Sequence, residues 1–142
     1  MISAIDTNIL LDILLPNPSF CEASVQALEN SAVVGSLVIC DLVYAELCVH
    51  FAAQGDCDEF LAANEIRVES LTRATHFAAS RVWRQYRRQG GSRMRILADF
   101  LVGAHAQQQA NRLLSRDRGF YRTLFPSLNL IDPSAHEDHS QE

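Results

Sequence analysis

Residues 2–14 read ISAIDTNILLDIL, an apolar segment interrupted by the polar triplet 6–8 and by Asp12. Residues 2–5 have the length and apolar character of a short buried strand, and the triplet 6–8 (Asp-Thr-Asn) supplies side chains that cap helices. The predicted helix extends to Leu14, because Pro16 breaks it. A buried strand that leads directly into a helix is typical of α/β proteins.

The rest of the chain repeats this alternation. Further strands are predicted at residues 33–36, 67–71, 112–115 and 128–131. Further helices are predicted at residues 19–30, from Asp41, from Asp56 or Asp58, at 72–89, at 96–111 and as a short turn at 119–125. This alternation favours a parallel sheet of about five strands with helices on both faces.

Length and composition are those of one domain. The 142 residues are 48% hydrophobic, which is enough to fill a single core. We therefore expect one α/β domain over residues 1–132. Residues 133–142 are polar and acidic, and we expect them to form a disordered tail.

The charged residues are divided unevenly along the chain. All 12 basic residues are arginines, so phosphate loops, Schiff bases and general bases that need a lysine amine are excluded. Residues 1–66 have a net charge of −10, whereas residues 67–131 have a net charge of +9. Because the candidate site residues below come from both halves, we interpret these charges as complementary parts of one domain.

The N-terminal segment lacks the pattern of a secretion signal or a membrane span. Asp6 and Asp12 interrupt its apolar residues, and no basic residue precedes it. The four cysteines have no paired spacing of a metal or redox motif, so we expect reduced thiols in the core. The protein is therefore expected to be cytoplasmic.

Four carboxylates occur in apolar surroundings near predicted strand and helix ends. Asp6 directly follows the first strand, Asp117 lies just beyond 112–115, and Asp99 and Glu46 interrupt apolar helical segments. The carboxyl ends of parallel strands meet at one edge of a sheet, where ligands bind. Buried carboxylates need a partner, and Mg²⁺ or Mn²⁺ prefers such hard oxygen ligands. An ion of this kind can activate water for attack on a phosphodiester.

Each of these carboxylates also has a simpler explanation. Asp6 can cap the helix that begins at Thr7, and the helix dipole favours Asp99 at a helix start. Asp117 can be a turn residue, and Glu46 can pair with an arginine. The joint placement of all four acids favours a common site.

Four motifs resemble those of the PIN domain family and, within it, the VapC-type toxins of bacterial toxin–antitoxin pairs. They are residues 5–12 (IDTNILLD), 43–47 (VYAEL), 97–106 (LADFLVGAHA) and 113–121 (LLSRDRGFY), in the order of the family. The resemblance spans residues 2–131. It implies a three-layer α/β/α fold with a central, mostly parallel sheet.

The resemblance also implies a Mg²⁺- or Mn²⁺-dependent endoribonuclease. Four carboxylates would build its metal site: Asp6, Glu46, Asp99 and Asp117. Ser115 matches a position where the family has Thr or Ser beside the fourth acid, so we include it among the catalytic residues. RNA as substrate, a cognate antitoxin as partner and a homodimer are likewise implied. Asp12 and Asp41 fall outside the four metal positions and are interpreted as helix-end residues.

Arginines that adjoin the motif acids are candidates for RNA contact, because arginine binds phosphate in a bidentate manner. They are Arg93, Arg95, Arg116 and Arg118. A second set, Arg81, Arg84, Arg87 and Arg88, follows one side of the helix predicted at 72–89, with Trp83 and Tyr86 between them. This second set can bind RNA, pair with acids of the N-terminal half within the fold or across a dimer interface, or face solvent. RNA contact is favoured only for the first set, because those arginines adjoin the motif acids.

His105 lies six residues after Asp99, so it is expected to point away from that carboxylate and to be a packing or interface residue.

Two other functions are compatible with the sequence. One is a PIN domain without nuclease activity that binds RNA or a protein. The other is a metal-dependent phosphohydrolase of small substrates. The four intact acids count against the first, and the absence of a cap sequence counts against the second.

Overall fold

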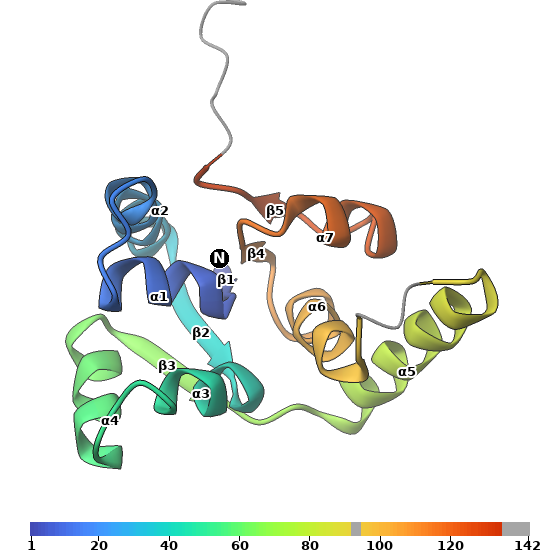
Figure 1. Cartoon of the computed structure of the whole chain (residues 1–142), viewed down its shortest axis with the longest axis horizontal. Helices are drawn as coiled ribbons and strands as arrows, with labels where there is room; N and C mark the ends of the chain where they lie inside the picture. Colours follow the sequence, from blue (N-terminus) through green and yellow to red (C-terminus); the bar gives the residue numbers. More distant parts are fainter. Residues whose placement is uncertain (92–94, 135–142) are drawn as a thin grey trace, which may run out of the picture.

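The computed structural model describes residues 1–91 and 95–134 and shows a five-stranded parallel sheet between two layers of helices (Figure 1). The strands are β1 (Ile2–Ile5), β2 (Ser36–Cys40), β3 (Ile66–Glu69), β4 (Arg112–Leu114) and β5 (Leu130–Ile131). The helices are α1 (Thr7–Leu14), α2 (Cys21–Val34), α3 (Asp41–Cys48), α4 (Gln54–Ala63), α5 (Arg73–Arg88), α6 (Leu97–Gln109) and α7 (Arg118–Leu124). The predicted three-layer α/β/α fold is confirmed.

The strand order is β3-β2-β1-β4-β5, and each neighbouring pair is parallel. Figure 1 shows α1 to α4 on one side of the sheet and α5 to α7 on the other. The chain moves outward from β1 to β3 and then returns through α5 and α6 to β4, which pairs with β1. Since the direction of the connections reverses between β1 and β4, a ligand crevice is expected at their carboxyl ends.

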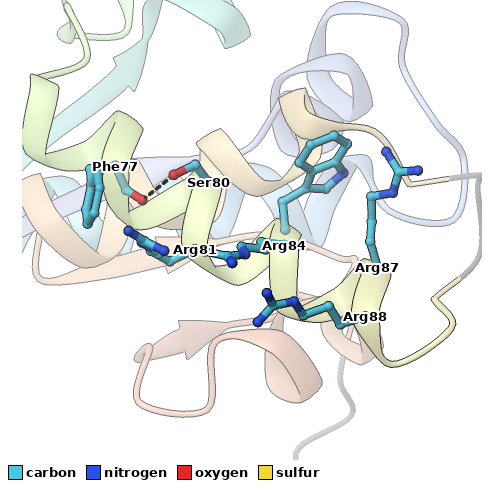
Figure 2. Close-up of a pocket in the computed structure, with 7 residues that line it drawn as sticks. Phe77, Ser80, Arg81, Arg84, Arg87 and Arg88 are labelled. Carbon is cyan, nitrogen blue, oxygen red and sulfur yellow. Dashed lines mark hydrogen bonds between the residues drawn. The ribbon is translucent and has the colours of Figure 1, made fainter.

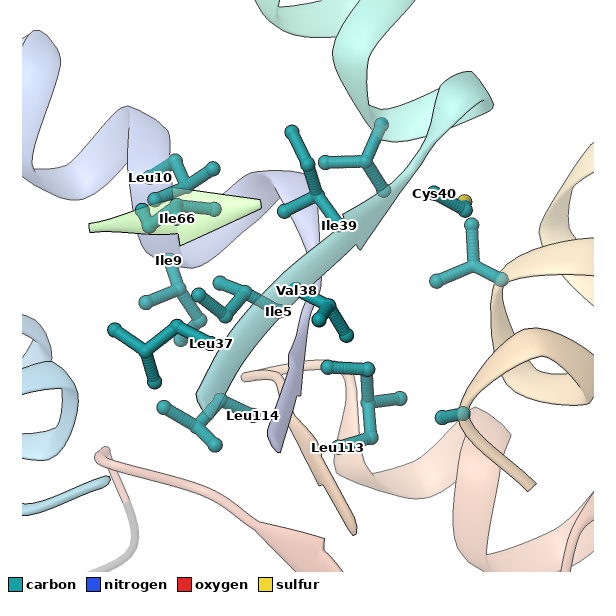
Figure 3. Packing of buried hydrophobic residues seen from close by; sticks show 14 of the residues in the cluster. Ile5, Ile9, Leu10, Leu37, Val38, Ile39, Cys40, Ile66, Leu113 and Leu114 are labelled. Carbon is teal, nitrogen blue, oxygen red and sulfur yellow. The ribbon is translucent and has the colours of Figure 1, made fainter. Parts of the chain in front are cut away.

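The three central strands form the middle of the core (Figure 3). Ile5 of β1, Ile39 of β2 and Leu113 of β4 are fully buried, as expected for a sheet covered on both faces. Each such side chain contributes about 1.5–3 kcal/mol to the free energy of folding. Phe100 of α6 and Phe125, which directly follows α7, are also buried and fill the layer on one side of the sheet. The core therefore fixes the strand ends that carry the candidate site.

The strand predicted at residues 33–36 is wrong. Helix α2 continues to Val34, and the strand β2 begins at Ser36. Val33 and Val34 are largely exposed, so their apolar character does not indicate burial. The break falls at Gly35, where a Cβ atom would lie 1.7 Å from the carbonyl oxygen of Met1. Only glycine permits this close approach, which the sequence pattern does not reveal.

Other element boundaries differ by a few residues, as is usual for helix and strand ends. Helix α4 begins at Gln54 instead of Asp56 or Asp58, and β3 covers Ile66–Glu69 instead of 67–71. Arg93 and most of the predicted tail, residues 135–142, lie outside the described residues.

All four cysteines are free thiols, as predicted, and two of them, Cys40 and Cys57, are buried. In the described part of the chain, each helix is too short or too polar to cross a bilayer.

Candidate active site

A polar cavity of about 350 Å³ lies at the carboxyl ends of β1 and β4. All four carboxylates predicted from the sequence line it: Asp6, Glu46, Asp99 and Asp117. They come from the end of β1, from α3, from the first turn of α6 and from the residue before α7. The fold therefore brings together acids that are separated by up to 111 residues in the sequence.

Asp6 is the most enclosed of the four carboxylates. Its backbone N–H donates to the carbonyl of Leu114 at 2.9 Å, which ties the end of β1 to β4. Its Oδ1 accepts from the backbone N–H of Thr7 at 2.8 Å, so Asp6 does cap α1. Its Oδ2 accepts from the hydroxyls of Ser115 and Tyr121 at 2.8 and 2.9 Å. Burial raises the pKa of Asp6 above its usual value despite these hydrogen bonds.

Ser115 joins two of the acidic segments. While its Oγ donates to Asp6, it accepts from the backbone N–H of Asp117 at 3.0 Å and from Asn8 Nδ2 at 3.2 Å. The side chain is fully buried. Its hydroxyl therefore orients both Asp6 and the segment that carries Asp117.

Asn8 and Tyr121 belong to the site, although neither is in the predicted set of site residues. Asn8 Oδ1 also accepts from the backbone N–H of Arg116 at 3.1 Å, so its amide links α1 to the segment before α7. Burial and the adjacent Asp6 raise the pKa of Tyr121 well above its usual value, which keeps its hydroxyl a donor. Both residues lie inside the quoted motifs, but only their folded positions identify them as partners of the acids.

Glu46 and Asp99 occupy the α3 and α6 sides of the cavity. Glu46 Oε1 accepts from the hydroxyl of Thr7 at 3.0 Å. Burial raises the pKa of Glu46, and the charges of Asp6 and Asp99 raise it further. Asp99 Oδ2 accepts from the backbone N–H of Ile96 at 3.0 Å, so Asp99 caps α6 as well as lining the cavity. The cavity is therefore electrostatically unfavourable for carboxylates unless a cation balances them.

Asp117 is paired with an arginine. Arg95 donates to both of its carboxylate oxygens, at 2.9 and 3.3 Å. The Arg95 guanidinium also lies 4.3 Å from the centre of the Phe120 ring, which helps to hold it. Arg95 itself lines the cavity. It is thus placed both to neutralise Asp117 and to meet an anion that enters the site.

Arg116 and Arg118 are also predicted to contact RNA, but unlike Arg95 they do not line the cavity. The Arg116 guanidinium donates through Nε and Nη2 to the two carboxylate oxygens of Asp12, both at 2.8 Å. Asp12 lies in the last turn of α1, as a helix-end residue would, but its side chain is buried and also accepts from Ser24 at 2.8 Å. Arg118 is half exposed and lies 3.7 Å from Asp132.

His105 is buried on α6, and its Nε2 lies 2.6 Å from Oε1 of Glu69 on β3. It does not line the acidic cavity. The interpretation of His105 as a packing residue fits this position.

The side chains that line the cavity fit a hard divalent cation. The four carboxylates provide oxygen ligands, and their negative charge exceeds the positive charge of Arg95. Within residues 1–91 and 95–134, however, no three acidic, histidine or cysteine side chains are grouped closely enough to hold one ion. Two of the four carboxylates already have partners in this arrangement, since Arg95 donates to Asp117 and the Ile96 N–H donates to Asp99.

Comparisons with known proteins agree with the fold. The family model of the PIN domain matches residues 4–125. No curated protein sequence matches the chain. One similar solved structure is VapBC2 from Rickettsia felis bound to a DNA fragment from its promoter, with a TM-score of 0.72 at 21% identity. That match covers 93% of this chain and 98% of the other.

Two further solved structures are similar. VapBC-1 from nontypeable Haemophilus influenzae has a TM-score of 0.72 at 16% identity, covering 95% of this chain and 100% of the other. A toxin–antitoxin complex from Klebsiella pneumoniae has a TM-score of 0.68 at 20% identity, covering 92% and 97%. At these identities the similarity concerns the fold.

Proposed function

Because the chain belongs to the PIN domain family, we propose that it is a metal-dependent endoribonuclease and the toxin of a toxin–antitoxin pair. One observation carries the proposal. Four carboxylates from four separate segments line a single cavity at the carboxyl ends of β1 and β4. A structural role would not require so many acids in one enclosed place, because their mutual repulsion opposes folding.

Asp6, Glu46, Asp99 and Asp117 are the residues that would hold Mg²⁺ or Mn²⁺. When bound, the cation would supply an activated water and neutralise the negative charge that develops on the phosphate. Ser115 and Tyr121 fix the Asp6 carboxylate through their hydroxyls, and Asn8 fixes Ser115 in turn. Arg95 lines the same cavity and would bind the phosphodiester once it releases Asp117, while Arg118 lies one residue beyond that acid.

Similar folds in VapBC complexes support a protein antitoxin as partner. An antitoxin arginine would complement the acidic cavity by charge. A homodimer and a cytoplasmic location, where RNA and antitoxin are both accessible, complete the proposal.

One observation favours a different function. Asp117 is already paired with Arg95, and among the described residues no three-ligand cluster is assembled. A PIN domain that binds RNA or protein without cleaving it would have these properties. Binding of Mn²⁺ without RNA cleavage would support this alternative.

The test combines growth and cleavage. Expression of the wild-type chain should arrest bacterial growth, and the purified protein should cleave RNA in the presence of Mg²⁺ or Mn²⁺. Asp99→Asn should abolish both effects, because it removes a ligand charge and retains a side-chain oxygen that can accept from Ile96. Asp56 occupies the equivalent third position of α4 and is exposed, so Asp56→Asn is the matched control. Full activity of Asp99→Asn would refute the proposal.

A further inference from the structure

The outward side of α5 carries a group of arginines that the acidic cavity does not use. Arg81, Arg84, Arg87 and Arg88 project from this side with Phe77 and Ser80 (Figure 2). With Trp83, these seven residues line a shallow groove of about 580 Å³. We call the four arginines together with Phe77 and Trp83 the α5 arginine face. The opposite side of α5 is buried at Thr75 and Ala79 and packs on α6.

The charges on this face are not balanced locally. Helix α5 contains five arginines and no acidic residue, so the alternation of signs found on an ordinary solvated helix is absent. In the part of the chain that the structure describes, none of the four arginines of the face forms an ion pair. Arg84 and Arg88 are four residues apart, a spacing at which like charges destabilise a helix. An anionic ligand would relieve this repulsion.

Aromatic rings lie between the arginines. Phe77 is 60% exposed, so one face of its ring is accessible beside the arginines. The Arg81 guanidinium lies 4.5 Å from the centre of its ring, and Arg87 lies 5.1 Å from that of Trp83. Trp83 is only partly exposed, and its Nε1 is buried, so its contribution to this face is the ring and not a hydrogen bond. Guanidinium groups alternating with aromatic rings are what single-stranded nucleic acids bind, through phosphate contact and base stacking.

We propose that the α5 arginine face binds the backbone and bases of single-stranded RNA. This inference rests on the proposed function and adds to it the surface that holds the substrate. Four carboxylates repel a phosphodiester, so the acidic cavity is a poor source of affinity for RNA. A cationic helix elsewhere on the same domain supplies that affinity. The aromatic rings favour RNA over an acidic protein segment, which offers carboxylates but no bases to stack.

Binding is measured by fluorescence anisotropy with a fluorescein-labelled 20-nucleotide polyuridine RNA in EDTA, so that cleavage does not interfere. Arg84→Gln/Arg88→Gln should weaken binding about tenfold or more, since two charge-assisted contacts are lost. The slope of log affinity against log salt should become shallower by about 1.4, or about 0.7 for each lost phosphate contact. Phe77→Leu should weaken binding about fivefold or more through lost stacking.

The matched control is Arg67→Gln/Arg122→Gln, which also removes two exposed arginines but lies on β3 and α7. It should leave both the affinity and the salt slope unchanged. Equal losses in the two double variants would overturn the proposal, because they would indicate a general charge effect. Displacement of the RNA by polyglutamate as efficient as by unlabelled polyuridine would overturn it as well. So would loss of a dimer by Arg84→Gln/Arg88→Gln in sedimentation velocity, since the face would then be a protein interface.

Failure of this inference can be told apart from failure of the proposed function. If the wild-type protein cleaves RNA while Arg84→Gln/Arg88→Gln binds polyuridine normally, only the α5 arginine face is refuted. If the face binds RNA as predicted and no divalent cation supports cleavage, only the nuclease activity is refuted. With both correct, the double variant should show a raised KM for RNA and an unchanged kcat, because the face contacts substrate away from the carboxylates.

Discussion

Arg95 donates to both carboxylate oxygens of Asp117, with Nη1 to Oδ2 at 2.9 Å and Nη2 to Oδ1 at 3.3 Å. The two side chains are 35% and 36% exposed, so solvent screens the pair and its net free energy is about 1 kcal/mol or less. An interaction this weak can be exchanged for one with a divalent cation. Arg95 thus stabilises Asp117 while no cation is bound. When a cation takes its place at Asp117, the guanidinium becomes available to bind a phosphate.

Arg95→Gln should therefore raise the affinity for Mn²⁺ about two- to fivefold, because the competing guanidinium is removed from Asp117. Isothermal titration calorimetry measures this directly. Arg118→Gln removes an arginine beside Asp117 that is paired with Asp132 instead, and should leave the affinity unchanged. Weaker Mn²⁺ binding by Arg95→Gln would show that Arg95 organises the site instead of competing for it.

Tyr121→Phe should weaken Mn²⁺ binding by about tenfold, since hydrogen-bond partners that orient a metal ligand typically contribute this much. The substitution keeps the ring that packs against Phe120 and Phe125 and removes only the donor to Asp6. Tyr86→Phe, outside the acidic cavity, is a comparison variant of the same chemistry. An unchanged Mn²⁺ affinity in Tyr121→Phe would mean that Ser115 and the Thr7 N–H are sufficient to orient Asp6.

Glu46→Gln should stabilise the metal-free protein at neutral pH. The raised pKa of Glu46 means that the folded state holds its proton more tightly than the unfolded state does, where the value is near 4.5. The unfolding free energy of the wild type therefore increases as pH falls from neutral through the folded pKa. The substituted amide would be neutral throughout, and its oxygen would still accept from Thr7.

Urea unfolding in EDTA measures this effect. The gain should be at most about 1 kcal/mol, because the side chain is exposed and solvent screens its charge, and it should disappear towards pH 4.5. Glu59→Gln on the exposed side of α4 should change nothing. A gain that grows on acidification would contradict the direction of the pKa shift.

Arg116→Ala should destabilise the fold by about 3 kcal/mol or more, because it leaves Asp12 buried and charged without its partner. Arg122→Ala, which removes an exposed arginine of α7, should cost about 0.5 kcal/mol or less. Denaturant unfolding compares the two variants. Similar stabilities would show that Ser24 alone is a sufficient partner for Asp12.

The acids of the site could be predicted from the sequence because they mark local boundaries. Asp6 directly follows β1 and caps α1, and Asp99 caps α6. Both positions can be recognised from the residues next to them in the sequence. The same local reasoning failed at Gly35, where a contact with Met1 decides the end of α2. It also missed the ion pair of Asp12, whose partner Arg116 lies 104 residues away in the sequence. Pairings that depend on two distant segments meeting can be found only in the folded chain.

On the function proposed above, the four carboxylates form one metal centre that cleaves RNA. The most direct test of this proposal is the cleavage rate of a defined RNA oligonucleotide by the wild-type protein and by Asp99→Asn, in EDTA and after Mn²⁺ is added back. We predict cleavage only by the wild type and only with Mn²⁺, while circular dichroism shows both proteins folded. Cleavage that persists in EDTA, or that Asp99→Asn retains, would contradict the claim.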